Sequence, residues 1–245
     1  MTLSVEKWGV SLFIFKTRDA LNVCKIVMPF AWFIAFLTLT VGMIWGLFYS
    51  PADYQQGESV RIMYVHVPAS WWALGIYTFC ASVSAIGLIG RLPLCFLIAK
   101  AFAPIGASFT VISLVTGSIW GKPTWGAWWV WDARLTSMLM LLFLYIGYLN
   151  FAHNARQEKT LTAASIFLII GLVNIPIIKW SVNWWYTLHQ PASLMRFDKP
   201  AIHHSMLWPL LIMALGFGAY ALALGCWRLT TIIRERQRER EALSA

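Results

Sequence analysis

Charge is the scarcest property of this sequence. Only 12% of the 245 residues are charged, whereas 59% are hydrophobic. A soluble domain usually carries about 25% charged residues, so most of this surface is expected to face hydrocarbon instead of water. The length fits a single polytopic membrane domain over residues 1–245. It accommodates about six membrane spans of roughly 20 residues each.

Motifs for redox and nucleotide chemistry are also missing. The four cysteines form no CxxC pair and lie in or beside apolar stretches, which favours packed thiols over a redox centre. The segment 117–123 resembles a phosphate-binding loop, but it has one residue too few between its glycines. It also has a proline where magnesium binding needs Ser or Thr. Neither a thiol-based enzyme nor an ATPase is therefore predicted.

Six apolar runs reach the length of a membrane span. In hydrocarbon the backbone must satisfy its own hydrogen bonds, and helices that are apolar on all sides do so. We therefore predict an all-α membrane protein with six transmembrane helices. The fifth run is the weakest, because it contains Asn174 and Pro176. The runs are roughly 27–49, 69–90, 98–119, 134–152, 161–179 and 205–227.

The basic residues are distributed unevenly between the two sides that six spans create. Both termini share one side, which holds 13 of the 19 Lys and Arg residues, and the other side holds six. Because Lys and Arg accumulate in cytoplasmic loops, both termini are predicted to be cytoplasmic. The net charge of +9 is attributed to this topology, and no nucleic-acid partner is predicted. Three loops then face outward, at about 50–68, 120–133 and 180–204.

The predicted outer layer is rich in tryptophan. It contains or adjoins 12 of the 15 tryptophans, whereas an ordinary aromatic belt decorates both membrane interfaces. Two interpretations remain open for the middle loop: an interfacial segment whose indoles sit among lipid headgroups, or a flat apolar platform for a large planar ligand. Gly121 and Gly126 would let the backbone approach such a ligand closely. The tryptophans of this loop are Trp120, Trp125, Trp128, Trp129 and Trp131.

Two histidines flank this loop in the sequence, His66 in the first outer loop and His189 in the last. Two neutral imidazoles on opposite faces of an iron porphyrin would complete its axial coordination, and a hydrophobic shell would limit access of solvent. The pair therefore favours the platform and predicts a haem site on the outer face. Solvated histidines are the alternative, and His203 and His204 are rival ligands near the start of the last run.

Three charged residues of the outer layer have two interpretations each. Asp132 precedes the fourth run, where it would either cap the helix or belong to the haem site. Arg61 and Lys122 would either pair with the two haem propionates or be ordinary loop charges.

The segment WGKPTWGAWWVWDARLT, residues 120–136, resembles the characteristic motif of the WWD-domain haem-handling membrane proteins of cytochrome c maturation. With HVP at 66–68 and LHQ at 188–190, the likeness covers nearly the whole chain and is greatest to the haem exporter protein C family. The resemblance implies that His66 and His189 are axial ligands of a transient, non-covalent b-type haem, and that the WWD segment holds the ring. It also implies a bacterial inner-membrane location with the haem site facing the periplasm.

The resemblance further implies the partners of this chain. They are a periplasmic haem chaperone (component E), the ATP-binding cassette transporter components A and B, a small membrane protein D, and the lipid bilayer. ATP hydrolysis would then belong to the partners, and this chain is expected to be a haem-transfer component instead of an enzyme.

Two other functions remain as alternatives to haem transfer. A transporter that moves haem through its own bundle would need polar groups along its path, and the predicted spans have few ionisable side chains. An electron-transfer subunit would need histidines that face each other within spans.

Overall fold

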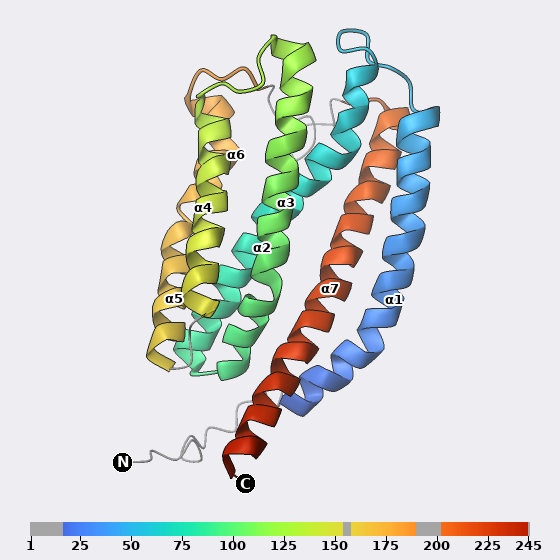
Figure 1. Ribbon diagram of the computed structural model, residues 1–245. Helices are drawn as coiled ribbons and strands as arrows, with labels where there is room; N and C mark the ends of the chain where they lie inside the picture. Colours follow the sequence, from blue (N-terminus) through green and yellow to red (C-terminus); the bar gives the residue numbers. More distant parts are fainter. Residues whose placement is uncertain (1–16, 154–157, 190–201, 245) are drawn as a thin grey trace.

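The computed structural model describes residues 17–153, 158–189 and 202–244. These residues form helices and loops, with one isolated β-bridge between Asp53 and Gly57 and no sheet (Figure 1). The helical elements are α1 (Thr17–Ile44), the π-helical turn η2 (Trp45–Tyr49), the 3-10 turn η3 (Glu58–Ile62), α2 (Met63–Gly90), α3 (Pro93–Trp125), α4 (Ala133–His153), α5 (Glu158–Gly171), α6 (Asn174–Trp184) and α7 (His204–Ser244).

The predicted all-α fold is confirmed. Six helical stretches of the described residues are long and apolar enough to cross a membrane. They run along one bundle, in which α2 and α3 lie between the α1–α7 pair and the group formed by α4, α5 and α6 (Figure 1). The start of α1 and the end of α7 lie at one end of this bundle.

Small residues line the contacts between these helices. Ala31 and Ala35 of α1 are buried, whereas Phe33 and Phe36 on the same helix are exposed. Without a hydrophobic driving force between helices in lipid, small side chains promote association because they let two backbones approach closely. The large aromatic side chains of α1 are then left for the surface that hydrocarbon would cover.

The spans extend further than the hydropathy pattern predicts. His66 and Pro68 lie within α2, and the loop ahead of η3 comprises residues 50–57 only. The helix α3 continues to Trp125, so the loop between α3 and α4 comprises residues 126–132 only. Gly126 ends α3 in the left-handed conformation with a φ of 78°, which glycine adopts without steric cost. The predicted loops at 50–68 and 120–133 were therefore too long.

The fifth span is broken, where the sequence predicted its weakest run. Residues 172 and 173 separate α5 from α6 through hydrogen bonds between residues three apart. Asn174 is buried at the start of α6, and its Nδ2 donates to the carbonyl oxygen of Ser137 on α4 at 2.9 Å. This bond satisfies a polar side chain inside the bundle and ties α6 to α4.

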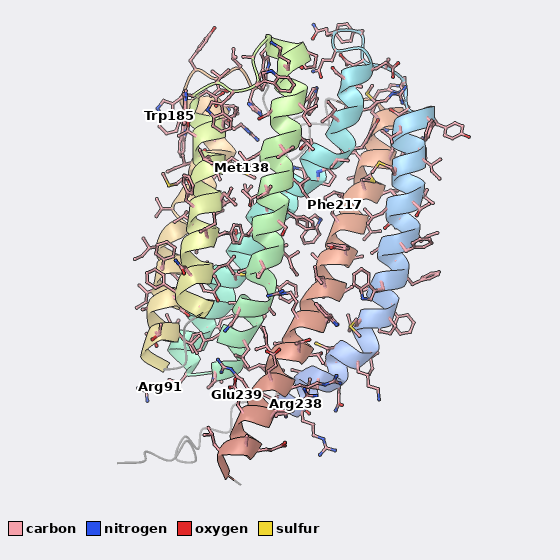
Figure 2. The ribbon with its side chains drawn as sticks, viewed as in Figure 1. Arg91, Met138, Trp185, Phe217, Arg238 and Glu239 are labelled. Carbon is pink, nitrogen blue, oxygen red and sulfur yellow. The ribbon has the colours of Figure 1, made fainter. Side chains whose placement is uncertain are left out.

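Loops 50–57, 126–132 and 185–189 gather at the end of the bundle opposite the C-terminal end of α7 (Figure 1). Trp185 lies at this end, whereas Arg91, Arg238 and Glu239 lie at the opposite one (Figure 2). The three loops that the hydropathy pattern placed on one side therefore do share a side.

Gly106 is the close-packing position of this bundle with the clearest consequence. It is buried on α3, and a Cβ there would overlap the hydroxyl of Tyr145, which itself donates to the Ala73 carbonyl at 2.8 Å.

We expect Gly106→Ala to lower the free energy of unfolding by about 1–3 kcal/mol, because the buried tyrosine must shift. The matched control is Gly75→Ala on α2, where the nearest atom to a new Cβ is 3.9 Å away. It should stabilise the helix by about 0.5–1 kcal/mol. Thermal unfolding in detergent measures the stability of both variants, and equal shifts in Tm would contradict the close packing of Tyr145 against Gly106.

Candidate functional site

A cavity of about 380 Å³ lies among α2, α3, α4 and α6, and side chains from α7 and from the loops also reach it. Its volume falls within the range of about 300–1,000 Å³ that is typical of sites for small molecules and cofactors. The wall is mostly apolar, and four of the outer-layer tryptophans contribute to it. These are Trp71, Trp120, Trp125 and Trp129.

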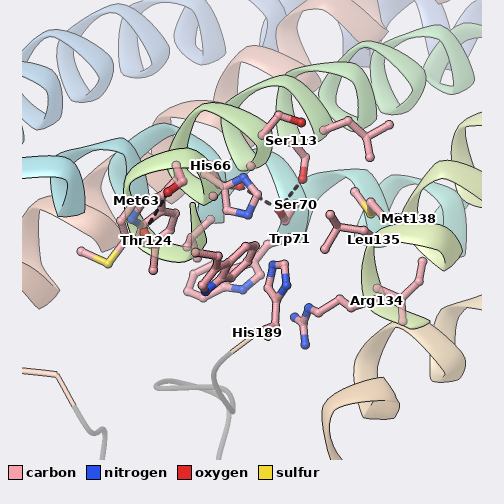
Figure 3. Close-up of a pocket in the computed structure, with 18 of the residues that line it drawn as sticks. Met63, His66, Ser70, Trp71, Ser113, Thr124, Arg134, Leu135, Met138 and His189 are labelled. Carbon is pink, nitrogen blue, oxygen red and sulfur yellow. Dashed lines mark hydrogen bonds between the residues drawn. The ribbon is translucent and has the colours of Figure 1, made fainter. Parts of the chain in front are cut away.

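His66 and His189 both line this cavity, although one belongs to α2 and the other to the loop after α6 (Figure 3). Each imidazole packs against an indole from the end of α3. The ring of His66 meets that of Trp120 edge-on at 5.7 Å between centroids, and the ring of His189 lies 4.8 Å from that of Trp125. The structure thus brings together the two histidines that the sequence singled out.

The position of His66 depends on α3. Its Nδ1 lies 3.1 Å from the hydroxyl oxygen of Thr116. A Cβ on Gly117 would lie 2.9 Å from the Cε1 of His66, so the absence of a side chain there leaves room for the imidazole. One turn further along α2, the Ser70 and Ser113 hydroxyls are hydrogen-bonded at 2.6 Å. The α2–α3 contact therefore holds this imidazole at the cavity wall.

Asp132 is the N-terminal cap of α4, as one of its two interpretations predicted. Its Oδ1 accepts a hydrogen bond from the Leu135 amide at 2.8 Å. Its Oδ2 lies 3.9 Å from the Nδ1 of His189, and both atoms are buried without a hydrogen-bond partner in the described part of the chain. One carboxylate therefore serves the helix and also faces a histidine of the cavity.

The environment of Asp132 changes its acidity. Burial raises the pKa of the Asp132 carboxyl, but the neighbouring His189 ring and the Leu135 amide lower it more. The pKa is therefore below its ordinary value, and the group is ionised at neutral pH.

The tryptophans of the middle loop region differ in where they lie. The indole Nε1 of Trp120 donates to the Gln56 side chain at 2.9 Å, and the buried Nε1 of Trp129 lacks a partner among the described residues. Trp128 and Trp131 are 59% and 75% exposed and do not line the cavity. The segment therefore contributes indoles both to the cavity wall and to the exposed surface of the protein.

Neither of the predicted cations lines the cavity. Arg61 donates to the Gly46 carbonyl in η2 at 3.0 Å and pairs with Glu58. The Nζ of Lys122 donates to the Gly126 carbonyl at 3.0 Å, at the end of α3. Both side chains thus bind groups at helix ends.

Two cations that the sequence analysis did not single out line the cavity instead. Arg134 lies in the first turn of α4, and Lys179 lies on α6. The signal that could have found Arg134 was its place inside the predicted fourth run, because ionisable residues within a membrane span almost always face the bundle interior or a cavity.

The rival histidines lie elsewhere. His203 and His204 are exposed at the start of α7, and His203 pairs with the Ser205 hydroxyl through its Nδ1 at 2.8 Å. Neither lines the cavity.

The donor set limits what the cavity can bind. The described residues contain no group of three or more His, Cys, Asp or Glu side chains that could hold a bare metal ion. Two imidazoles can complete the coordination of an ion that already has its other ligands, as the iron of a porphyrin does. The indole walls and the nearby cations suit such a flat, apolar ring with acidic substituents.

Comparison with known proteins gives consistent matches over most of the chain. The family profile described as heme exporter protein C matches residues 13–244. The chain is 46% identical to heme exporter protein C of Escherichia coli over 226 residues, which are 91% of this chain and 90% of that protein. It is 45% identical to heme exporter protein C of Haemophilus influenzae over 223 residues, 90% and 88% of the two chains. A ccmC-like mitochondrial protein of Marchantia polymorpha, named for cytochrome c biosynthesis, is 50% identical over 193 residues, 79% and 80% of the two chains.

The cap at Asp132 predicts a dependence of stability on pH. The pKa of the folded state lies below that of the unfolded state, so the carboxylate stabilises the fold above the unfolded pKa. Asp132→Ala should cost about 0.5–2 kcal/mol at neutral pH, because the Leu135 amide loses its acceptor. Asp132→Asn should cost less, since its amide oxygen still accepts. Thermal unfolding from pH 7 to pH 3 should show the difference between the native chain and Asp132→Asn shrinking below about pH 4. A difference that grows in acid would contradict this assignment.

Proposed function

The chain belongs to the heme exporter protein C family, and from this premise we propose that it binds haem in the cavity between His66 and His189. The site lies at the periplasmic face of the bacterial inner membrane. From there the haem passes to a periplasmic haem chaperone during the biogenesis of c-type cytochromes. The observation that carries the proposal is the meeting of these two imidazoles, distant in sequence, in one cavity with indole walls.

In this proposal the chain's residues position the cargo and do not make or break covalent bonds in it. His66 and His189 supply the two axial nitrogens. Trp120 and Trp125 back the imidazoles and limit their rotation, because each indole packs against one of them. The apolar wall excludes water, which would otherwise compete for the iron. The haem is b-type and held transiently, so it can leave when its acceptor is in place.

Arg134 is better placed for a propionate than either of the two cations that the sequence predicted. It lines the cavity in the first turn of α4, whereas Arg61 and Lys122 bind backbone carbonyls at helix ends. A guanidinium can hold a carboxylate through two parallel hydrogen bonds. The Nε1 of Trp129, which has no partner among the described residues, is a further donor in the same wall.

The partners proposed for this chain supply what it lacks. It has no phosphate-binding loop of the required spacing, so ATP hydrolysis is assigned to the ATP-binding cassette components A and B. The small membrane protein D and the haem chaperone, component E, complete the assembly. In this arrangement the chain presents haem, and the transporter's ATP hydrolysis is coupled to release of the loaded chaperone.

The ligand assignment is tested by optical spectroscopy of the purified protein. The native chain loaded with haem should show the low-spin spectrum of bis-histidine coordination. His66→Ala and His189→Ala should each lose it and bind haem roughly tenfold or more weakly, because an axial bond is missing. The control is His203→Ala, which removes an exposed histidine at the same end of the bundle. If both cavity variants keep the native spectrum, the ligand assignment is wrong.

The orientation is tested by labelling single cysteines in intact spheroplasts. The four native cysteines are buried, whereas Tyr54 is 91% exposed in loop 50–57 at the cavity end. Tyr54→Cys should react with a membrane-impermeant maleimide from outside. Gln237→Cys, which is exposed near the opposite end of α7, should react only after lysis. The reverse pattern would place the cavity in the cytoplasm and refute the proposed delivery to a periplasmic acceptor.

A further inference from the structure

The two histidines of the cavity differ in what lies behind them. The Nδ1 of His66 faces a neutral hydroxyl, that of Thr116, at 3.1 Å. The Nδ1 of His189 faces a carboxylate oxygen, the Oδ2 of Asp132, at 3.9 Å. An outer partner of an axial histidine fixes its tautomer and changes how strongly the other nitrogen donates. The two imidazoles are therefore not equivalent.

The contacts of the Thr116 hydroxyl indicate the direction of its bond with His66. Its single proton has an acceptor in the Ile112 carbonyl, at 2.6 Å, with the Ser113 carbonyl at 3.3 Å. With the proton placed there, we infer that the contact at 3.1 Å is donated by the Nδ1 of His66. The Nε2 of His66 is then unprotonated and free to bind a metal. The partner that holds this tautomer, the Thr116 hydroxyl, is uncharged and itself donates to a backbone carbonyl.

The pair formed by Asp132 and His189 is incomplete. Both facing atoms are buried and lack a partner among the described residues, which costs about 1–3 kcal/mol for each such group. Asp132 is fixed, because its other oxygen binds the Leu135 amide and caps α4. His189 lies on a loop against the face of Trp125. A movement of this ring by about 1 Å would bring the two atoms within hydrogen-bonding distance.

We propose that Asp132 and Thr116 are positioning residues that make the two axial ligands unequal, with His189 the stronger donor and His66 the exchangeable one. This inference rests on the proposed function. When haem is bound, the His189 ring turns, its Nδ1–H donates to Asp132, and its Nε2 binds the iron more strongly. Ligand exchange then begins on the other face: the bond from iron to His66 breaks, and an incoming donor takes its place. No electron is transferred in this step.

The first test compares midpoint potentials of the bound haem. A carboxylate behind an axial histidine stabilises the ferric form, so Asp132→Asn should lower the preference for ferric over ferrous iron by about tenfold, a rise of about 59 mV for one electron. Thr116→Val removes the other partner and should change this ratio by less than about threefold. Asp53→Asn is the matched control, because Asp53 also accepts from backbone amides in a loop at this end of the bundle, whereas Asp132 in addition faces the Nδ1 of His189.

Two outcomes overturn the proposed inequality of the two ligands. In one, Asp132→Asn shifts the potential no more than Asp53→Asn does. In the other, Thr116→Val shifts it as much as Asp132→Asn. If either result is found while the native chain shows the bis-histidine spectrum, only the inequality of the ligands is refuted. If that spectrum persists in His66→Ala and His189→Ala, the proposed function is refuted as well. Thermal unfolding of the haem-free variants shows whether Asp132→Asn has kept its fold.

A second measurement avoids substitutions of Asp132. In His66→Gly and His189→Gly, external imidazole should restore the six-coordinate spectrum. The gap left by His189 still contains Asp132, which can accept the N–H of the added imidazole. We expect its Kd there to be about tenfold lower than in the gap left by His66. Equal affinities, or tighter binding in the His66 gap, would overturn the proposal.

Discussion

The close antiparallel contact between α2 and α3 is the constraint on which the rest of this structure depends. The link between the helices is short, and Arg91 makes the turn in the left-handed conformation with a φ of 53°. From there the helices stay in contact up to the cavity, where the Ser70 and Ser113 hydroxyls meet at 2.6 Å. One turn beyond, His66 rests against Gly117. The side chain proposed to bind iron is thus positioned by helix packing that begins at the opposite end of the bundle.

The second half of the site is built differently. His189 lies on a loop, and what surrounds it comes from the ends of α3 and α4 through Trp125 and Asp132. Elements at helix ends move more readily than packed helix interiors, because fewer contacts hold them. The helix contact fixes His66, whereas the loop leaves the His189 ring free for the turn toward Asp132 that we propose on haem binding.

Several features of the sequence were sufficient to predict the fold and the centre of the site. The apolar runs predicted six spans, and the histidines on either side of a tryptophan-rich segment predicted the residues that meet in the cavity. The weak fifth run is the broken one, and Asn174 lies at the break. The roles of Arg61 and Lys122 could not be predicted, because a basic residue near a helix end has the same sequence pattern whether it binds a carbonyl or a ligand. Arg134 lines the cavity from the first turn of α4.

By itself, the sequence determined the all-helical membrane architecture and the family, and it singled out two histidines as candidate ligands, because hydropathy, length and a distinctive motif are properties of the linear chain. Only the tertiary structure decided where α3 ends, which tryptophans face the cavity, and which atom stands behind each histidine. Those outcomes depend on distances of a few ångströms between α2, α3, α4 and the loop after α6. Such distances are set by how small residues let the helices approach, and no local pattern in the chain encodes them.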